Sequence, residues 1–154
     1  MTLNHVAKAA AAAILTLAAG FAAADTQSLA VSASVKAVCK FNSGQTPALA
    51  FGEIDPSLSG DKTATANVLY RCTNGTSASV TDVTGPRNMS GSGTAAGEMM
   101  AYTLAFDSGA SGTGSGFGSG KDITLAVSGK ITATQYENAM VGSYADTVTL
   151  TVTP

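Results

Sequence analysis

The pattern of apolar and polar positions is most distinctive at residues 27–41, which alternate between apolar and small or polar side chains. Such alternation predicts a β-strand with one buried face. The apolar positions of the stretch are Leu29, Val31, Ala33, Val35, Ala37, Cys39 and Phe41. Most strands of globular domains are shorter than this. Two interpretations follow: one long edge strand of its own domain, or a segment before about Lys36 that is given to a neighbouring subunit.

Shorter stretches farther along the chain predict more strands. They cover residues 48–52, 62–72, 77–83, 99–106, 122–132 and 144–152. The last stretch alternates most regularly, with Val148, Leu150 and Val152 on one face and threonines on the other. Helical periodicity is absent from the sequence after residue 24. Strands of this length with frequent turn residues predict an all-β, immunoglobulin-like sandwich.

Connecting segments are indicated by turn-forming residues. They fall at residues 42–47, after Asp55, at residues 85–97 and at residues 108–120. The last segment consists almost entirely of Gly, Ser, Ala and Thr, with one aromatic residue, Phe117. Because such a composition offers little apolar surface to bury, we expect a mobile surface loop there.

The first 24 residues have the composition of a secretory signal peptide. Lys8 precedes an apolar run at residues 9–19, and alanines at positions 22–24 form a cleavage site before Asp25. The run is too short to span a membrane. An uncleaved anchor helix is the alternative. Cleavage leaves 154 − 24 = 130 residues, a size that suits one domain.

Charge and cysteine content limit the function of the exported chain. The single histidine and one of the eight basic residues fall in the signal peptide, so the net charge becomes 7 − 10 = −3, which does not suit nucleic-acid binding. Two cysteines in an exported chain predict a disulfide between Cys39 and Cys72; two buried free thiols are the alternative. Closing this loop contributes roughly 3 to 4 kcal/mol in the chain-entropy model.

Catalytic chemistry finds little support in the sequence. Without a histidine after cleavage, neither a Ser-His-Asp triad nor a histidine metal site can form. Motifs such as G-x-S-x-G, the P-loop and G-x-G-x-x-G are missing. Asp55, Asp61 and Asp107 are interpreted as solvated turn residues, with a calcium or glycosidase role as the alternative. We therefore predict no catalytic, cofactor-binding or metal-binding residues, and no enzyme activity.

Assembly is the function that the pattern favours. A small sandwich has sheet edges that must be covered. This chain has a detachable strand at one end and finishes on a strand at the other. If the first strand leaves, a groove opens beside the last strand, and a strand from another copy could fill it by β-augmentation.

Several motifs also match a known family. They are the alternating segment before Cys39, the sequence A-L-A-F-G at residues 48–52, the loop at residues 55–60, and Y-R-C-T-N-G-T at residues 70–76. M-A-Y-T-L follows at residues 100–104, and G-S-Y-A-D-T-V-T-L-T-V at residues 142–152. With these motifs the chain resembles the spore coat protein U domain family, which includes major subunits of archaic chaperone–usher pili. The resemblance covers almost all of the chain after the signal peptide.

The resemblance implies an immunoglobulin-like domain that lacks its last strand. Residues 25–36 would be an N-terminal donor strand and residues 37–154 the pilin domain. Leu29, Val31, Ala33 and Val35 would be donated, whereas Val148, Leu150 and Val152 would line the acceptor groove of the receiving subunit. Cys39 and Cys72 would form the family disulfide. A periplasmic chaperone would lend a strand during export, and the next subunit would replace it at an outer-membrane usher.

The resulting hypothesis is a structural pilus subunit that polymerises by donor-strand exchange and supports adhesion or biofilm formation. Its partners would be the chaperone, the usher and other copies of itself or related subunits, with no nucleic acid and no cofactor. The chain would cross the inner membrane, pass through the periplasm and end in a cell-surface pilus. The alternative is a secreted or spore-coat-like surface protein that completes its own sandwich.

Overall fold

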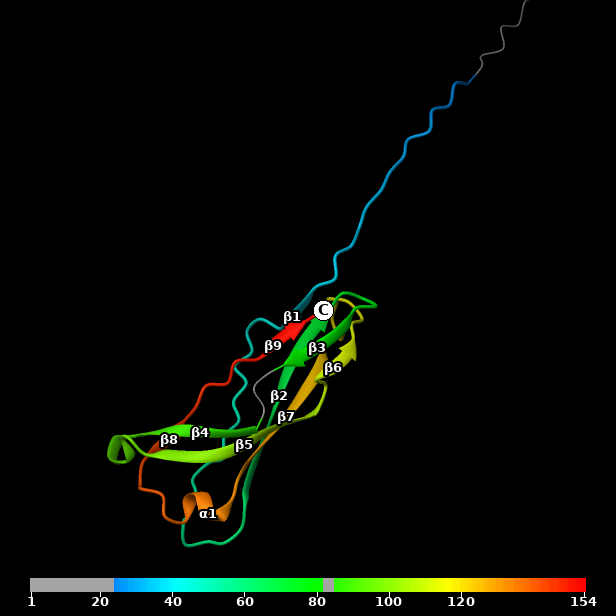
Figure 1. The fold of residues 1–154 in the computed structure, drawn as a ribbon. Helices are drawn as coiled ribbons and strands as arrows, with labels where there is room; N and C mark the ends of the chain where they lie inside the picture. Colours follow the sequence, from blue (N-terminus) through cyan, green and yellow to red (C-terminus); the bar gives the residue numbers. More distant parts are fainter. Residues whose placement is uncertain (1–23, 82–84) are drawn as a thin grey trace, which may run out of the picture. The chain divides into compact units, whose positions relative to one another are not determined.

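The computed structural model describes residues 24–81 and 85–154 (Figure 1). The predicted signal peptide therefore lies outside the described residues, apart from Ala24. The chain divides into two units, Met1–Ala33 and Ser34–Pro154. In the first unit, residues 24–33 form neither helix nor strand, and all of them are exposed. We call the second unit the body.

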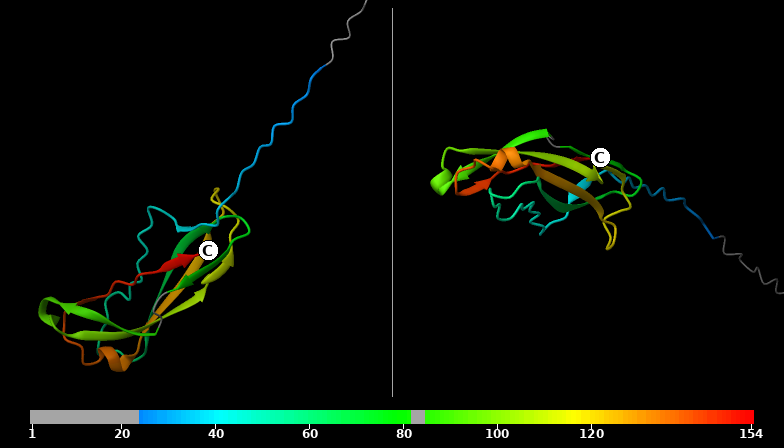
Figure 2. Two further views of the ribbon diagram at one scale, coloured as in Figure 1. Left: turned by 45° about the horizontal axis from the view of Figure 1, so that its top comes forward. Right: turned by 90° about the horizontal axis from the view of Figure 1, so that it is seen from below.

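The described residues of the body form two antiparallel sheets (Figures 1 and 2). The first has the order β1-β2-β7-β5-β4-β8, made of Cys39–Phe41, Lys62–Cys72, Ile123–Ile131, Met99–Ser108, Gly85–Ser92 and Ser143–Ala145. The second has the order β6-β3-β9, made of Ser111–Thr113, Ser77–Thr81 and Thr151–Thr153. Two short helices, η1 (Gly93–Ala95) and α1 (Ala133–Tyr136), join strands. The predicted all-β, immunoglobulin-like sandwich is thus confirmed.

The core is built on the pairing of β2 with β7, which runs without a break from Lys62↔Ile131 to Tyr70↔Ile123. Along both strands every second side chain points inward, as the period of a strand requires. The buried apolar residues come from β2, β3, β4, β5, β7 and the helices: Val68, Tyr70, Cys72, Ala78, Val80, Met89, Ala95, Met100, Tyr102, Leu104, Leu125, Val127, Ile131 and Tyr136. Strand β2 has the bounds predicted from its alternation.

Several predicted elements differ from those observed. Of the long stretch at residues 27–41 only β1 is a strand, and residues 48–52 form no strand although Leu49 and Phe51 face inward. A strand needs a hydrogen-bonded neighbour as well as an alternating sequence. The final stretch is divided: β8 belongs to the first sheet, β9 to the second, and residues 146–150 between them belong to neither.

Two structured segments were missed. Residues 85–97, predicted to be a loop, contain β4 and η1, and β4 pairs with β5 from Gly85↔Leu104 to Ser90↔Met99. Strand β4 is rich in glycine and serine, so it lacks the alternation of large apolar and polar side chains by which a strand is predicted. Helix α1 begins with a capping box between Thr132 and Gln135. The T-x-x-Q spacing is a signal for a helix start that could have been found in the sequence.

The glycine-rich segment at residues 108–120 is also corrected. Instead of forming one mobile loop, its first half contributes β6, which pairs with β3, and Ala110 packs against the core. Backbone hydrogen bonds join Gly114 to Gly75 and Thr76 at 2.9 and 2.7 Å. The segment is held through its main chain, which a composition argument does not consider.

Candidate functional site: a groove with unpaired walls

A groove of about 990 Å³ opens in the body between two extended segments. One wall is formed by residues 47–54 and the other by residues 139–150. The floor consists of core side chains of the first sheet: Ala66, Val68, Met89, Met100, Tyr102, Leu104, Val127 and Ile131. In Figure 1 the first wall is part of the cyan-green trace that follows β1, and the second is the orange-red segment that runs through β8 toward β9. The floor side chains apart from Ala66 are themselves buried, so the groove lies over part of the core, between segments that are remote in sequence.

The first wall packs on the sheet through Leu49, Phe51 and Ile54, all of them half-buried. The ring of Phe51 lies edge-on to that of Tyr102, with centroids 6.2 Å apart. Gly129 of β7 makes room for this wall, because a Cβ there would lie 2.7 Å from Leu49 and 2.9 Å from Phe51. The wall can therefore pack closely on β7 only because this inward position of the strand is a glycine without a side chain.

The second wall contains the predicted acceptor residues. Val148, Leu150 and Val152 pack against the core but remain half-buried, whereas Thr147, Thr149 and Thr151 are exposed. Val148 and Leu150 line the groove, and Val152 lies just beyond them in β9. The structure therefore places these three residues on one inward face, in the alternation seen in the sequence.

Parts of both walls have main-chain amide and carbonyl groups that are not paired with other backbone groups. Among the residues that the structure describes, none makes a backbone-to-backbone hydrogen bond with residues 48–54 or 146–150. Strand β9 pairs with β3 and stands at the edge of the second sheet. Because unpaired main-chain donors and acceptors favour the addition of a strand, the groove offers a hydrogen-bonding edge together with apolar side chains.

A polar cluster interrupts the apolar second wall at Asp146. The Tyr102 hydroxyl donates to Asp146 Oδ2 at 2.7 Å, Arg87 Nε donates to the same oxygen at 3.2 Å, and the Thr147 amide donates to Oδ1 at 2.7 Å. Both Asp146 and Tyr102 line the groove, and Tyr102 is only 4% exposed. Sequence reasoning did not pair any acidic residue, so it missed this cluster. The only signal for it is that Asp146 shares the inward parity of Val148 and Leu150.

The cluster fixes the charge state of its members. The hydrogen bond from Tyr102, followed by those from Thr147 and Arg87, holds the pKa of Asp146 below its ordinary value against the opposing effect of burial. Burial first, and then the hydrogen bond to Asp146 and its negative charge, raise the pKa of Tyr102 to about 12. At neutral pH the groove therefore contains a carboxylate with a phenol donating to it.

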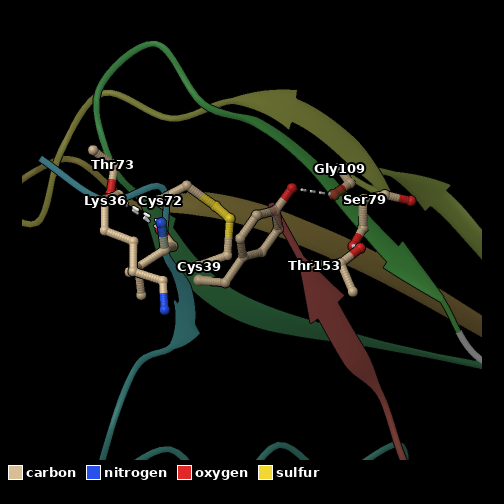
Figure 3. Close-up of a disulfide and its surroundings, with 9 residues drawn as sticks. Lys36, Cys39, Cys72, Thr73, Ser79, Gly109 and Thr153 are labelled. Atoms are coloured by element: carbon tan, nitrogen blue, oxygen red, sulfur yellow. Dashed lines mark hydrogen bonds between the residues drawn. A yellow bond between two sulfur atoms is a disulfide. The ribbon is translucent and has the colours of Figure 1, made fainter.

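The N-terminal end of the body is fastened at one point (Figure 3). Cys39 and Cys72, which face each other in the β1–β2 register, form the predicted disulfide. Thr73 binds the backbone just before Cys39. Its amide donates to the Val38 carbonyl at 2.9 Å, and its hydroxyl donates to the Lys36 carbonyl at 3.0 Å. The chain is thus fixed to its own body from Lys36 onward.

The predicted donor residues have a different environment. Leu29, Val31, Ala33 and Val35 lie outside any strand, and Leu29, Val31 and Val35 are each 85% exposed. For apolar side chains in a row, exposure of this degree indicates a surface that a partner covers. Their assignment as a donor strand stays a prediction.

Other kinds of site find no support in the described part of the chain. No three His, Cys, Asp or Glu residues there are grouped so that they could hold a metal ion. Within the same residues, no helix has the length and apolar character needed to cross a bilayer.

The class defined by this geometry is an incomplete β-sandwich with an open groove. The family model of the Spore Coat Protein U domain matches residues 25–151, so the chain belongs to this family, that of archaic chaperone–usher pilus subunits. Membership makes the chain a surface structural protein of the fimbrial or spore-coat U type, from a family of non-enzymatic subunits that assemble with other subunits. No curated protein sequence matches the chain.

Proposed function

We propose that this chain is a pilus subunit that polymerises by donor-strand exchange, with residues 25–36 of one copy filling the groove of the next. The observation that carries the proposal is the match between the two parts. The groove has an open hydrogen-bonding edge beside half-buried Val148 and Leu150, and the N-terminal segment has an exposed apolar row on one parity. The groove lacks a neighbouring strand, and the N-terminal segment lacks a surface that covers its apolar side chains.

The energetics favour insertion. A strand laid along the groove forms a ladder of main-chain hydrogen bonds and buries its four apolar side chains. Each such side chain contributes roughly 1 to 2 kcal/mol by burial, and each hydrogen bond about 1 kcal/mol net. The process requires no catalytic residue, in agreement with the character of the family.

The arrangement of the body also supports one direction for the inserted strand. The body's own N-terminal segment is anchored beside β1 and β9, at the end opposite α1 and β8 (Figure 1). In a head-to-tail polymer the next body must attach at the α1 end, because the other end is already used. Residues 146–153 run from that end toward β9. The donated strand therefore lies antiparallel to them, with its C-terminal end near β8.

The cellular setting follows from the same arrangement. An open apolar groove is an aggregation hazard until it is filled, so a periplasmic chaperone covers it after export. An outer-membrane usher then exchanges the chaperone for the next subunit. The signal peptide at residues 1–24 directs the chain to this route, and the finished pilus supports adhesion or biofilm formation at the cell surface.

The experiment uses the exported, disulfide-bonded protein and a variant that lacks residues 25–35. Wild type should form ladders on gels in mild detergent without heating, because inserted strands leave slowly. The shortened variant should stay monomeric and should melt at a higher temperature when a synthetic peptide of residues 25–36 is added. A peptide with Leu29→Asp and Val31→Asp is the matched control. A wild-type monomer that does not respond to the peptide would favour a self-completed surface protein instead.

A further inference from the structure

The polar cluster at Asp146 restricts what can lie opposite it in the groove. Asp146 has the inward parity of Val148 and Leu150, and its carboxylate is held by Tyr102 and Arg87 at 2.7 and 3.2 Å. A bulky apolar side chain placed over this carboxylate would exclude water without offering a hydrogen bond, which is costly. A small side chain leaves space for water, which can bridge polar groups. The groove therefore has one position at which only a small residue fits well.

The N-terminal segment has one small residue in its apolar row. Leu29, Val31 and Val35 are large or branched, whereas Ala33 is small. In an antiparallel pair, directly opposed residues place their side chains on the same face. When Ala33 lies opposite Asp146, Val31 lies opposite Val148 and Leu29 opposite Leu150. Each large donor residue then covers an apolar wall residue.

Other registers fit less well. A shift of two residues in either direction places Val31 or Val35 over the carboxylate, and one of these shifts leaves Ala33 too small to cover Val148. Placing Ala37 opposite Asp146 would draw Lys36 into the neighbour's groove, although its carbonyl is bound to Thr73 of its own body. A shift of one residue turns the serines of the donor into the groove.

We propose that Asp146, positioned by Tyr102 and Arg87, sets the register of strand insertion by accepting Ala33 of a second copy opposite it. Val31 of that copy then pairs with Val148, and Val35 with Tyr144. This inference rests on the proposed function, since it assumes that residues 25–36 fill the groove. It makes the Asp146 cluster a specificity determinant that separates a matching donor strand from a similar strand with a branched residue at the same position.

Paired cysteines test the register in the full-length chain. One variant carries Val31→Cys with Val148→Cys, and its matched control carries Val31→Cys with Leu150→Cys. Directly opposed positions come close enough for a disulfide, whereas positions two residues apart along the partner strand do not. We expect the first variant to give oxidised multimers that survive boiling and disappear with reductant, several-fold faster than the second. Faster cross-linking of the second would overturn the register.

Substitutions at the two facing positions provide the second test. Ala33→Leu should reduce the yield of wild-type ladders strongly, whereas Ala33→Ser should leave it unchanged. Asp146→Ala in the accepting copy should restore assembly with the Ala33→Leu donor, since it removes the carboxylate and makes space. If Asp146→Ala does not accumulate, the cysteine pairs still decide the register.

The outcomes separate the two proposals. When the wild type forms no ladders and neither cysteine pair cross-links, donor-strand exchange itself is wrong. When ladders form but the Val31 and Leu150 cysteines cross-link faster, or Ala33→Leu assembles like wild type, the function stands and the role of Asp146 is wrong.

Discussion

The β2–β7 pair and the groove walls have similar sequences but different environments. Both alternate apolar with polar or small residues. In β2–β7 the register is continuous and the inward side chains are covered, with Leu125 and Ile131 0% exposed. In the groove walls the inward Val148 and Leu150 stay half-buried, and the backbone of residues 48–54 and 146–150 belongs to no strand. Alternation therefore shows which face is meant for burial, while the partner that covers it can belong to another molecule.

The largest effect is expected when carboxylates are introduced separately into the N-terminal segment and into the groove. Leu29→Asp with Val31→Asp should abolish donation, because carboxylates would have to enter an apolar groove at several kcal/mol in total. The subunit should still accumulate, form its disulfide and accept a donor peptide. Leu150→Asp should instead damage the groove itself. Periplasmic yield, ladder formation and peptide-induced stabilisation are the measurements.

A conservative control sharpens this prediction. Leu29→Ile with Val31→Ile keeps the apolar row and should leave the ladders intact. If the Leu29/Val31 aspartate variant is misfolded while wild type is a stable monomer, the segment belongs to its own domain, and the contrast between covered and open faces disappears.

Removing the disulfide tests the stability of the body itself, in which the inward side chains are covered. Cys39→Ala with Cys72→Ala should lower the free energy of unfolding by roughly 3 to 4 kcal/mol, since the loop closed by the bond has a sequence separation of 33. Urea unfolding of the shortened variant, which lacks residues 25–35, measures this without interference from polymerisation. A loss below about 1 kcal/mol would mean that the β1–β2 pairing and Thr73 alone hold the N-terminal end.

Glycine substitutions test how firmly the segment at residues 108–120 is held. A Cβ at Gly114 would lie 2.6 Å from both the Cβ and the carbonyl oxygen of Cys72, so Gly114→Ala should destabilise by about 1 to 3 kcal/mol. At Gly118 the nearest atom is 3.8 Å away, and Gly118→Ala should change stability by less than about 0.5 kcal/mol. Thermal melts compare the two. Equal effects would show that the segment behaves as a uniform loop after all.

A smaller, pH-dependent effect than that of the disulfide is expected at the polar cluster of the groove. Because the pKa of Asp146 is lowered in the folded state, its contribution to stability is present above the ordinary carboxyl pKa near 4 and is lost as pH falls through the folded value. Tyr102→Phe removes the first cause of that lowering. It should cost about 1 to 2 kcal/mol at pH 7 and less at pH 3. Urea midpoints at the two pH values measure the difference, and an equal loss at both would point to packing instead.

The sequence predicted those features that depend on side-chain parity. The bounds of β2, the inward face of Val148 and Leu150, and the sandwich class all follow from alternation in the chain. The sequence did not predict β4 and β6. These strands are rich in glycine and serine and are held by main-chain hydrogen bonds to β5 and β3 rather than by alternating side chains. The Asp146–Tyr102 bond could not be predicted either, because the two residues are 44 positions apart and meet only through the fold.

The fastening of the chain at Cys39 has a mechanical consequence. In a filament joined by donated strands, tension leaves each groove through residues 34–38 and enters the next body at β1. The disulfide passes that load covalently to Cys72 at the end of β2. Strand β2 is then pulled along its axis against β7, so that the bonds from Lys62↔Ile131 to Tyr70↔Ile123 share the force in shear rather than opening one by one. In a filament of the proposed kind, the body would therefore meet tension through the shear resistance of β2 against β7.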